Sequence, residues 1–253
     1  MNRKFGIKAW STNLNWIDII ADNYDKGYFA FLEFFAVPHT FNETHQKWEK
    51  IKHIPIVIHG VHSGFKVNWA DKEKEAFNRD EAHDGFLFAD YFNSDTLIFH
   101  PGYEGNVDET IRQLGSYHDN RIVVENKCHI CKEGKLIFRG STPEELKQIC
   151  DATGYDCCVD FAHAFCAANA KGFNGYEYIE RFLNEINYRI CHISDNYLDS
   201  IKDIHLGIGK GEYDFKRMLE MVKKDVYLTL ETPKNTFQDY VNDVKILRSL
   251  VNN

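Results

Sequence analysis

Short apolar runs recur along this chain, and each is followed by a longer segment whose apolar residues return at helical spacing. The runs cover residues 5–9, 28–35, 54–59, 96–100, 121–125, 157–161, 188–193 and 226–231. Strands that alternate with helices form parallel sheets, and near-continuous apolar runs are typical of strands that are covered on both faces. The pattern therefore predicts an α/β fold built on a parallel sheet.

The length of the chain favours a closed barrel over an open sheet. Eight strands in 253 residues leave about 32 residues for each strand with its helix, which is enough for a minimal βα unit, and a (β/α)₈ TIM barrel needs about 250 residues. No linker rich in Pro, Gly or Ser divides the chain, so we expect one domain over residues 1–253. An open doubly wound sheet is the alternative, because the first run is weakly marked.

Composition limits the cellular setting and the chemistry of the cysteines. No apolar stretch approaches the roughly 20 residues of a membrane span, and no secretion signal follows the basic start, so we expect a cytoplasmic protein without membrane contact. The seven cysteines are then expected to be free thiols. Cys128 and Cys131 have the spacing of a metal or redox pair, but no second pair accompanies them, and we expect a structural role.

Polar residues fall at or near the carboxyl end of seven of the eight runs. They are Glu33, His59, His100, Glu125, Asp160, His192 and Glu231. In a parallel barrel all strands point the same way, so these ends meet in one ring at the catalytic mouth. Burying one such group without a partner costs roughly several kcal/mol, so a ring of seven requires compensating positive charge.

Three further candidates lie in the segments that continue these strands. His163 follows Asp160 by three residues, so one tight turn would direct both side chains into the mouth. Asp203 and His205 alternate, which would direct both side chains the same way in extended backbone. Without Glu33 the pool holds five His, two Asp and two Glu. Mixed imidazole and carboxylate ligands without thiolate favour zinc, manganese or iron over calcium, and we expect two or three divalent ions.

Six segments of the chain resemble the endonuclease IV family, within the wider xylose isomerase-like TIM barrel superfamily. They are HPG at 100–102, VVENK at 123–127, VDFAHAF at 159–165, CHISDN at 191–196, DIHLGIGKG at 203–211 and LTLET at 228–232. The resemblance runs from about His59 to Thr232. It implies a DNA repair hydrolase that uses a trinuclear site, usually of zinc, to cleave a phosphodiester 5′ to an abasic site.

The same resemblance implies which ligands share an ion. His59, His100 and Glu125 would bind the first ion, Asp160, His192 and Glu231 would hold the second with Glu125 as the bridge, and His163, Asp203 and His205 would bind the third. Two ions bridged by a carboxylate suit phosphoryl transfer. Glu125 and Glu231 are the catalytic carboxylates in this interpretation.

The chain departs from the family where the family grips DNA. The residues that wedge into the duplex are replaced by His62 and Ser63, and residues 5–11 lack the family's first-strand histidine.

The formal charge of −8 disfavours binding to nucleic acid, although three bound divalent ions would change the net charge to about −2. A small phosphate ester or single-stranded nucleic acid is therefore an alternative substrate, and we keep Glu33 and His62 as candidate substrate-binding residues.

A sugar or sugar-phosphate isomerase or epimerase of the same superfamily is the main rival. Such an enzyme would need one ion, held by Glu125, Asp160, His192 and Glu231. Its two glutamates would act as paired acid and base on a carbon-bound proton, and Glu33 also fits this reading. The five surplus ligands, His59, His100, His163, Asp203 and His205, favour hydrolysis.

Overall fold

The fold is a closed barrel of eight parallel strands, as the alternation of strand and helix patterns predicts. The computed structural model describes residues 3–130, 136–233 and 236–251. The strands are β1 Lys4–Trp10, β2 Phe31–Phe35, β3 Ile56–His59, β4 Leu97–Phe99, β5 Ile122–Glu125, β6 Asp156–Asp160, β7 Tyr188–Ile193 and β8 Tyr227–Leu230. They run in chain order around the barrel, and β1 pairs with β8. This closure excludes the open doubly wound sheet.

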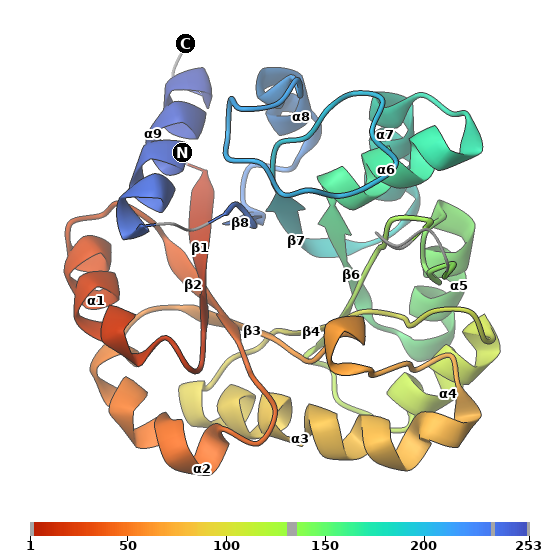
Figure 1. Ribbon diagram of the computed structural model, residues 1–253, viewed down its shortest axis with the longest axis horizontal. Helices are drawn as coiled ribbons and strands as arrows, with labels where there is room; N and C mark the ends of the chain where they lie inside the picture. Colours follow the sequence, from red (N-terminus) through yellow and green to blue (C-terminus); the bar gives the residue numbers. More distant parts are fainter. Residues whose placement is uncertain (1–2, 131–135, 234–235, 252–253) are drawn as a thin grey trace.

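Helices follow the strands and form a ring outside the barrel (Figure 1). The α-helices are α1 Ile17–Asp25, α2 Phe41–Thr44, α3 Glu75–Phe92, α4 Val107–Gly115, α5 Pro143–Thr153, α6 Phe161–Lys171, α7 Gly175–Glu185, α8 Phe215–Met221 and α9 Phe237–Val251. Short 3₁₀ turns lie at Leu14–Trp16, His45–Ile51, Ser63–Phe65 and Lys72–Lys74. Within the described ranges, none of these helices combines the length and the hydropathy that crossing a bilayer would take.

The start of α5 shows how the sequence sets a helix boundary. The Thr142 side chain accepts a hydrogen bond from the backbone N–H of Glu145 at 3.1 Å, and Pro143 occupies the first turn. Gly154 ends the helix in the left-handed conformation. A hydroxyl cap, an N-terminal proline and a C-terminal glycine each satisfy or avoid an orphan backbone group. The cap residue of α5 is therefore Thr142.

The inner face of the barrel changes from apolar to polar along the strands. A separate apolar cluster fills the floor of the barrel, and it consists of Phe31, Val57, Ile98, Val123, Cys158 and Ile190. Side chains two positions apart on a strand share a face, so the residue two positions further along also points inward. On these six strands, or directly after the end of β4 in the case of His100, the following inward residues are Glu33, His59, His100, Glu125, Asp160 and His192. The apolar floor therefore supports a polar ring above it.

The cysteines of the described part of the chain are buried free thiols, as expected. They are Cys128, Cys150, Cys157, Cys158, Cys166 and Cys191. Cys131 lies outside the described residues, so the structural role predicted for its pair with Cys128 stays a prediction. Burial raises the pKa of the Cys158 thiol well above its ordinary value, which keeps this thiol protonated at the barrel floor.

The absence of a side chain at Gly6 makes room for an aromatic ring inside the barrel. A Cβ atom there would lie 2.3 Å from Cζ of Phe31, and the Phe31 ring also stacks on Tyr227, with ring centroids 4.4 Å apart. We expect Gly6→Ala to lower the free energy of unfolding by about 1–3 kcal/mol, the usual cost of overpacking a core.

Gly115→Ala at the end of α4 is the matched control for Gly6→Ala. Its Cβ would meet only Thr153, at 3.5 Å, and alanine is favoured in a helix. This control should change the free energy of unfolding by less than about 0.5 kcal/mol or increase it. Chemical denaturation measures both variants, and equal stability of the two would contradict the packing described here.

Candidate metal centre

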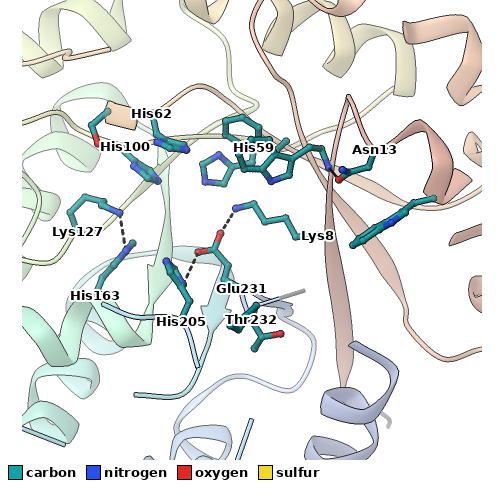
Figure 2. A pocket seen from close by; sticks show the side chains of 15 residues that line it. Lys8, Asn13, His59, His62, His100, Lys127, His163, His205, Glu231 and Thr232 are labelled. Atoms are coloured by element: carbon teal, nitrogen blue, oxygen red, sulfur yellow. Dashed lines mark hydrogen bonds and ion pairs between the residues drawn. The ribbon is translucent and has the colours of Figure 1, made fainter. Parts of the chain in front are cut away.

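The polar ring borders a cavity of about 610 Å³ at the carboxyl ends of the strands (Figure 2). The side chains that line this cavity include Lys8, Trp10, His62, His100, Lys127 and Glu231. The size is that of a small-molecule or cofactor site, and this end of a parallel barrel is where enzymes with this architecture place their catalytic groups.

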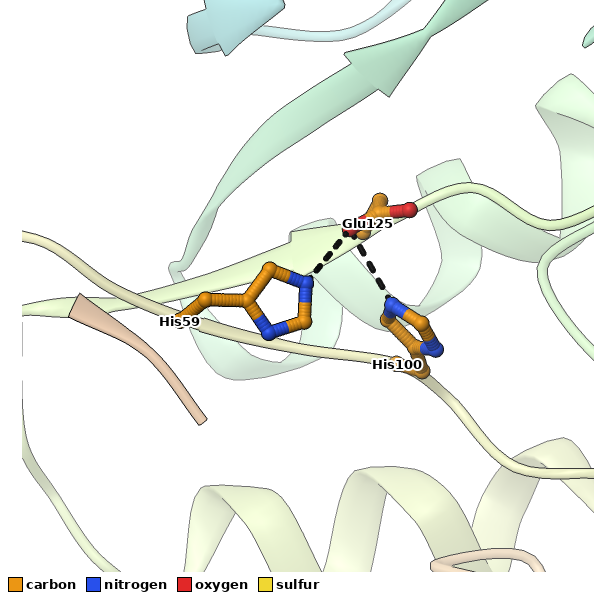
Figure 3. Close-up of side chains that lie close together, drawn as sticks. All are labelled: His59, His100 and Glu125. Carbon is orange, nitrogen blue, oxygen red and sulfur yellow. Dashed lines mark hydrogen bonds and ion pairs between the residues drawn. The ribbon is translucent and has the colours of Figure 1, made fainter. Parts of the chain in front are cut away.

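Glu125, the last residue of β5, lies at the centre of the ring. Its Oε2 atom is 3.1 Å from Nε2 of His100, 3.3 Å from Nε2 of His59 and 3.4 Å from Nδ1 of His192. Figure 3 shows the rings of His59 and His100 directed at this carboxylate from one side. The other oxygen, Oε1, lies 3.0 Å from Nδ1 of His163. One carboxylate thus faces imidazoles from four different parts of the chain.

A hydrogen bond on the far side of His59 determines which of its nitrogens carries the proton. Nδ1 lies 2.7 Å from the backbone oxygen of Gly60, so Nδ1 donates its hydrogen there. Nε2 is then the nitrogen that faces the Glu125 carboxylate, 3.3 Å away. A proton or a metal ion between the two atoms would hold them together, and a carbonyl behind the imidazole is the usual partner of a metal-binding histidine. His59, His100 and Glu125 therefore fit a metal ion.

His192 on β7 repeats this arrangement with more carboxylates. Its Nε2 donates to Oε2 of Glu33 at 2.8 Å. Its Nδ1 makes no hydrogen bond and faces Oε2 of Glu125 at 3.4 Å, Oε1 of Glu231 at 3.4 Å and Oδ2 of Asp160 at 4.0 Å. Burial alone would lower the pKa of His192, but the surrounding glutamates raise it to about 9. In the absence of a metal ion, a proton therefore binds His192 where the surrounding carboxylates favour positive charge.

The junction of β6 and α6 brings Asp160 and His163 together, as their three-residue spacing predicts. Oδ1 of Asp160 caps α6 by accepting a hydrogen bond from the backbone N–H of His163 at 2.6 Å. Oδ2 of Asp160 stays buried without a hydrogen bond, and burial raises the pKa of this carboxyl to about 6. The cap thus holds one oxygen and leaves the other oriented for a cation.

Asp203 and His205 meet in the ring, but the backbone between them is not extended. Nε2 of His205 lies 2.9 Å from Oδ2 of Asp203, which is also 3.2 Å from Nε2 of His163. The predicted alternation is wrong, because His205 has a left-handed φ of 51° and donates its backbone N–H to Oδ1 of Asp203 at 3.1 Å. An aspartate that accepts from the backbone two residues on forms an Asx turn, and this turn brings the two side chains together.

Glu33 is a fully buried member of the ring and does not line the cavity. It accepts hydrogen bonds from Nε2 of His192 and, at 2.7 Å, from the Thr229 hydroxyl. These contacts orient His192, as a carboxylate behind a metal-binding imidazole does. Of the two predicted substrate-binding residues, only His62 lies in the lining of the cavity. The geometry therefore gives Glu33 a supporting position and not a substrate contact.

Two buried lysines complete the ring, and neither is among the residues singled out from the sequence. Nζ of Lys8 on β1 lies 2.8 Å from Oε1 of Glu33 and contacts Oε1 of Glu231. Nζ of Lys127 lies 2.8 Å from Nε2 of His163. Each lysine lies two positions after an inward-facing residue, so its side chain also faces inward. This spacing could have identified both lysines from the sequence.

The ring carries more negative than positive charge. Its carboxylates are Glu33, Glu125, Asp160, Asp203 and Glu231, and its lysines are Lys8 and Lys127. Five negative charges against two positive charges leave a charge of −3 when all of these groups are ionised. Two divalent cations would change this to +1, a sign that attracts phosphate. The charge, the imidazole nitrogens that face Glu125 and the Asp160 oxygen without a hydrogen bond all fit a site for divalent metal ions.

Comparisons with known proteins agree with this fold. A probable endonuclease 4 from Metamycoplasma arthritidis is 27% identical over 209 residues, which are 74% of each chain. A D-tagatose 3-epimerase-like protein is similar in structure with a TM-score of 0.77 at 21% identity, covering 98% of this chain and 97% of its own. Endonuclease IV from Thermus thermophilus has a TM-score of 0.70 at 15% identity, covering 98% and 99%.

The two structural similarities lie at low sequence identity and support the fold alone. A family profile described as xylose isomerase-like TIM barrel matches residues 29–250. The predicted family resemblance is thereby confirmed, and the chain belongs to the xylose isomerase-like TIM barrel family.

Proposed function

We propose that this chain is a metal-dependent phosphodiester hydrolase of the endonuclease IV type, which uses at least two zinc ions to cleave DNA beside an abasic site. The observation that carries the proposal is the pair of imidazole nitrogens, Nε2 of His59 and Nδ1 of His192, that face Oε2 of Glu125 at 3.3 and 3.4 Å. Zinc suits a ligand set of imidazole and carboxylate. The relatives named probable endonuclease 4 support the same reaction.

Two ion positions in this proposal share Glu125. His59 and His100 would complete the first position, and the second would be completed by Asp160, His192 and Glu231. When bound, two such ions supply Lewis acidity to a phosphoryl group and to a water molecule. The surplus of histidines over a one-ion site supports two positions rather than one.

The chain's own groups would orient the ligands and handle the proton. Glu33 and the Gly60 carbonyl hold the imidazoles of His192 and His59 from behind. Among the described residues, Glu231 is the one carboxylate in the cavity lining, and its Oε1 atom contacts Lys8. A carboxylate at the edge of the cavity is placed to accept a proton from an attacking water, so we assign that role to Glu231.

A sugar isomerase or epimerase is the second candidate function. The observation in its favour is that Glu125, Asp160, Glu231 and His192 converge on one position, which would serve a single ion between paired glutamates. The epimerase-like neighbour supplies the same fold. His59 and His100 have no evident place in this reaction, whereas both face the central carboxylate here. Hydrolysis is therefore the function that uses the whole ring.

The test of the proposed function presents the zinc-loaded protein with a DNA duplex that carries one tetrahydrofuran abasic analogue, and with bis(p-nitrophenyl) phosphate in parallel. We expect a nick 5′ to the analogue that disappears when EDTA is added. His59→Ala removes a ligand and should lower the rate at least about 100-fold. His39→Ala should leave the rate unchanged, because His39 is exposed and pairs with Glu81 away from the ring.

The same experiment distinguishes the alternatives. If the protein hydrolysed the small diester but did not nick the duplex, the substrate would be a small phosphate ester and not DNA. If the protein hydrolysed neither compound but epimerised a ketose in the presence of metal, the proposed function would change from hydrolase to epimerase. If His59→Ala kept the full rate, the proposed two-ion site would be wrong.

Zinc affinity should fall as the pH is lowered, because protons and metal ions compete for the same atoms. The pKa of His192 is about 9 and that of Asp160 about 6 in the metal-free ring. Between pH 9 and pH 6 the ion must displace the His192 proton, so the apparent affinity should decrease about tenfold per pH unit. Below pH 6 the Asp160 proton adds to the competition and the decrease should steepen.

Titration with a competing chelator between pH 5.5 and pH 9 measures this dependence. Calorimetry in buffers of different ionisation enthalpy should show about one proton released per ring at pH 7.5. An affinity that does not change over this range, after correction for the chelator's own protonation, would contradict the assignment of His192 as a ligand.

A further inference from the structure

The lining of the cavity has two chemically different parts. One part consists of the imidazoles, carboxylates and lysines described above. The other part is apolar and is formed by Trp10, Trp16, Phe35 and Pro233. Trp10 is 40% exposed, whereas Phe35 beside it is buried. An apolar lining next to a few polar groups is typical of sites that bind a small organic ligand, so the apolar part needs a role of its own.

Hydrogen bonds and a ring contact hold Trp10, the last residue of β1, in place. Its backbone N–H donates to Oδ1 of Asn13 at 2.8 Å, and its backbone oxygen accepts the N–H of Asn13 at 2.8 Å. Its indole packs on the ring of Phe35, with centroids 4.8 Å apart. Figure 2 shows Asn13 across the cavity from His163. A side chain that is already held loses little conformational freedom when a ligand packs on it.

The apolar part of the lining adjoins the first ion position. Phe35 also contacts His59, with ring centroids 5.4 Å apart, so Trp10 lies one ring beyond a proposed zinc ligand. His62 connects the two parts, because its ring centroid lies 5.2 Å from that of Phe35 and 5.4 Å from that of His100. A ligand with a phosphate at the ions can therefore place a second group against Trp10.

A nucleobase is the group that suits this surface. Every base has a flat face that stacks on an aromatic side chain, whatever its sequence. The formal charge of −8 gives little attraction for the extended backbone of a duplex, so stacking would supply affinity that the phosphates do not. In a continuous duplex both faces of each base are covered by its neighbours. A single strand leaves faces uncovered, and an abasic site uncovers one face of the adjacent base.

We infer that Trp10 stacks on the uncovered face of a nucleobase in the strand whose phosphate lies at the metal centre. The substrate class is then nucleic acid with an unpaired base or with a gap in its base stack, and Trp10 determines this specificity. The inference rests on the proposed function, because it presupposes a phosphate at the ions.

The test compares two ligands that differ only in the base. They are thymidine 5′-monophosphate and 1′,2′-dideoxyribose 5′-phosphate, which is the same nucleotide without its base. Calorimetric titration of the zinc-loaded protein measures both dissociation constants. We expect the base to tighten binding about 5- to 150-fold, the usual contribution of one stacked base. Trp10→Ala should abolish this difference and leave the affinity for the ligand without a base unchanged.

Phe77→Ala is the matched control for Trp10→Ala. Phe77 is also 40% exposed, but it lies on α3 and is not part of the cavity lining. This control should change neither dissociation constant. Equal affinities of the unmutated protein for the two ligands, with cleavage of phosphodiesters intact, would overturn the inference and leave the proposed function standing. A preference for the base that persists in Trp10→Ala would overturn it as well.

Two further outcomes concern the proposed function. If the base tightens binding through Trp10 but no phosphodiester is cleaved, the hydrolase proposal is wrong and the stacking site stands. If neither ligand binds at millimolar concentration, both are wrong.

Photochemical crosslinking decides the question in the unmutated protein, even if Trp10→Ala does not fold. The probe is 5-iodo-2′-deoxyuridine 5′-monophosphate, whose base crosslinks under ultraviolet light to an aromatic ring on which it stacks. Peptide mass spectrometry should locate the crosslink at Trp10. A crosslink found only at other residues, such as Trp16, would overturn the inference.

Discussion

Buried negative charge at one end of the barrel is the constraint on which the rest of this structure depends. Four of the five ring carboxylates are fully or almost fully buried, and burying an unpaired carboxylate is strongly unfavourable. Lys8 and Lys127 neutralise part of this charge. The imidazoles neutralise more of it only by taking up protons, as the raised pKa of His192 shows. This end of the barrel therefore needs bound cations to neutralise its remaining negative charge.

The barrel produces this concentration of charge by a simple geometric rule. Residues two positions apart on a strand share a face, so an apolar floor residue is followed by a polar residue at the mouth, as in Val57 and His59 or Val123 and Glu125. Parallel strands in a closed barrel bring these second residues to the same end. The floor excludes water from below, and the cavity leaves the ring open to a substrate from above. Proteins named as epimerases and as endonucleases share this frame, so their chemistry depends on the side chains at its rim.

Much of the fold and of the ring could be predicted from the sequence, because both follow from short periodic patterns. The eight strands, and polar ends such as His100 and Asp160, depend on local alternation and on strands that all point the same way. The turn at Asp203 and His205 could not be predicted, since an Asx turn with a left-handed histidine has no periodic pattern. Lys8 and Lys127 were missed because lysine is usually a surface residue, although both continue an inward register. The supporting position of Glu33 depends on Thr229, a contact between β2 and β8 that no local pattern indicates.

The central claim is that cations complete the ring around Glu125, and diffraction from zinc-soaked crystals tests it most directly. Data collected on both sides of the zinc absorption edge would locate each ion in an anomalous difference map. We predict one peak within bonding distance of His59, His100 and Glu125 and a second beside Nδ1 of His192. A mouth without either peak, or zinc found only at surface groups such as His39 and Glu81, would contradict the account.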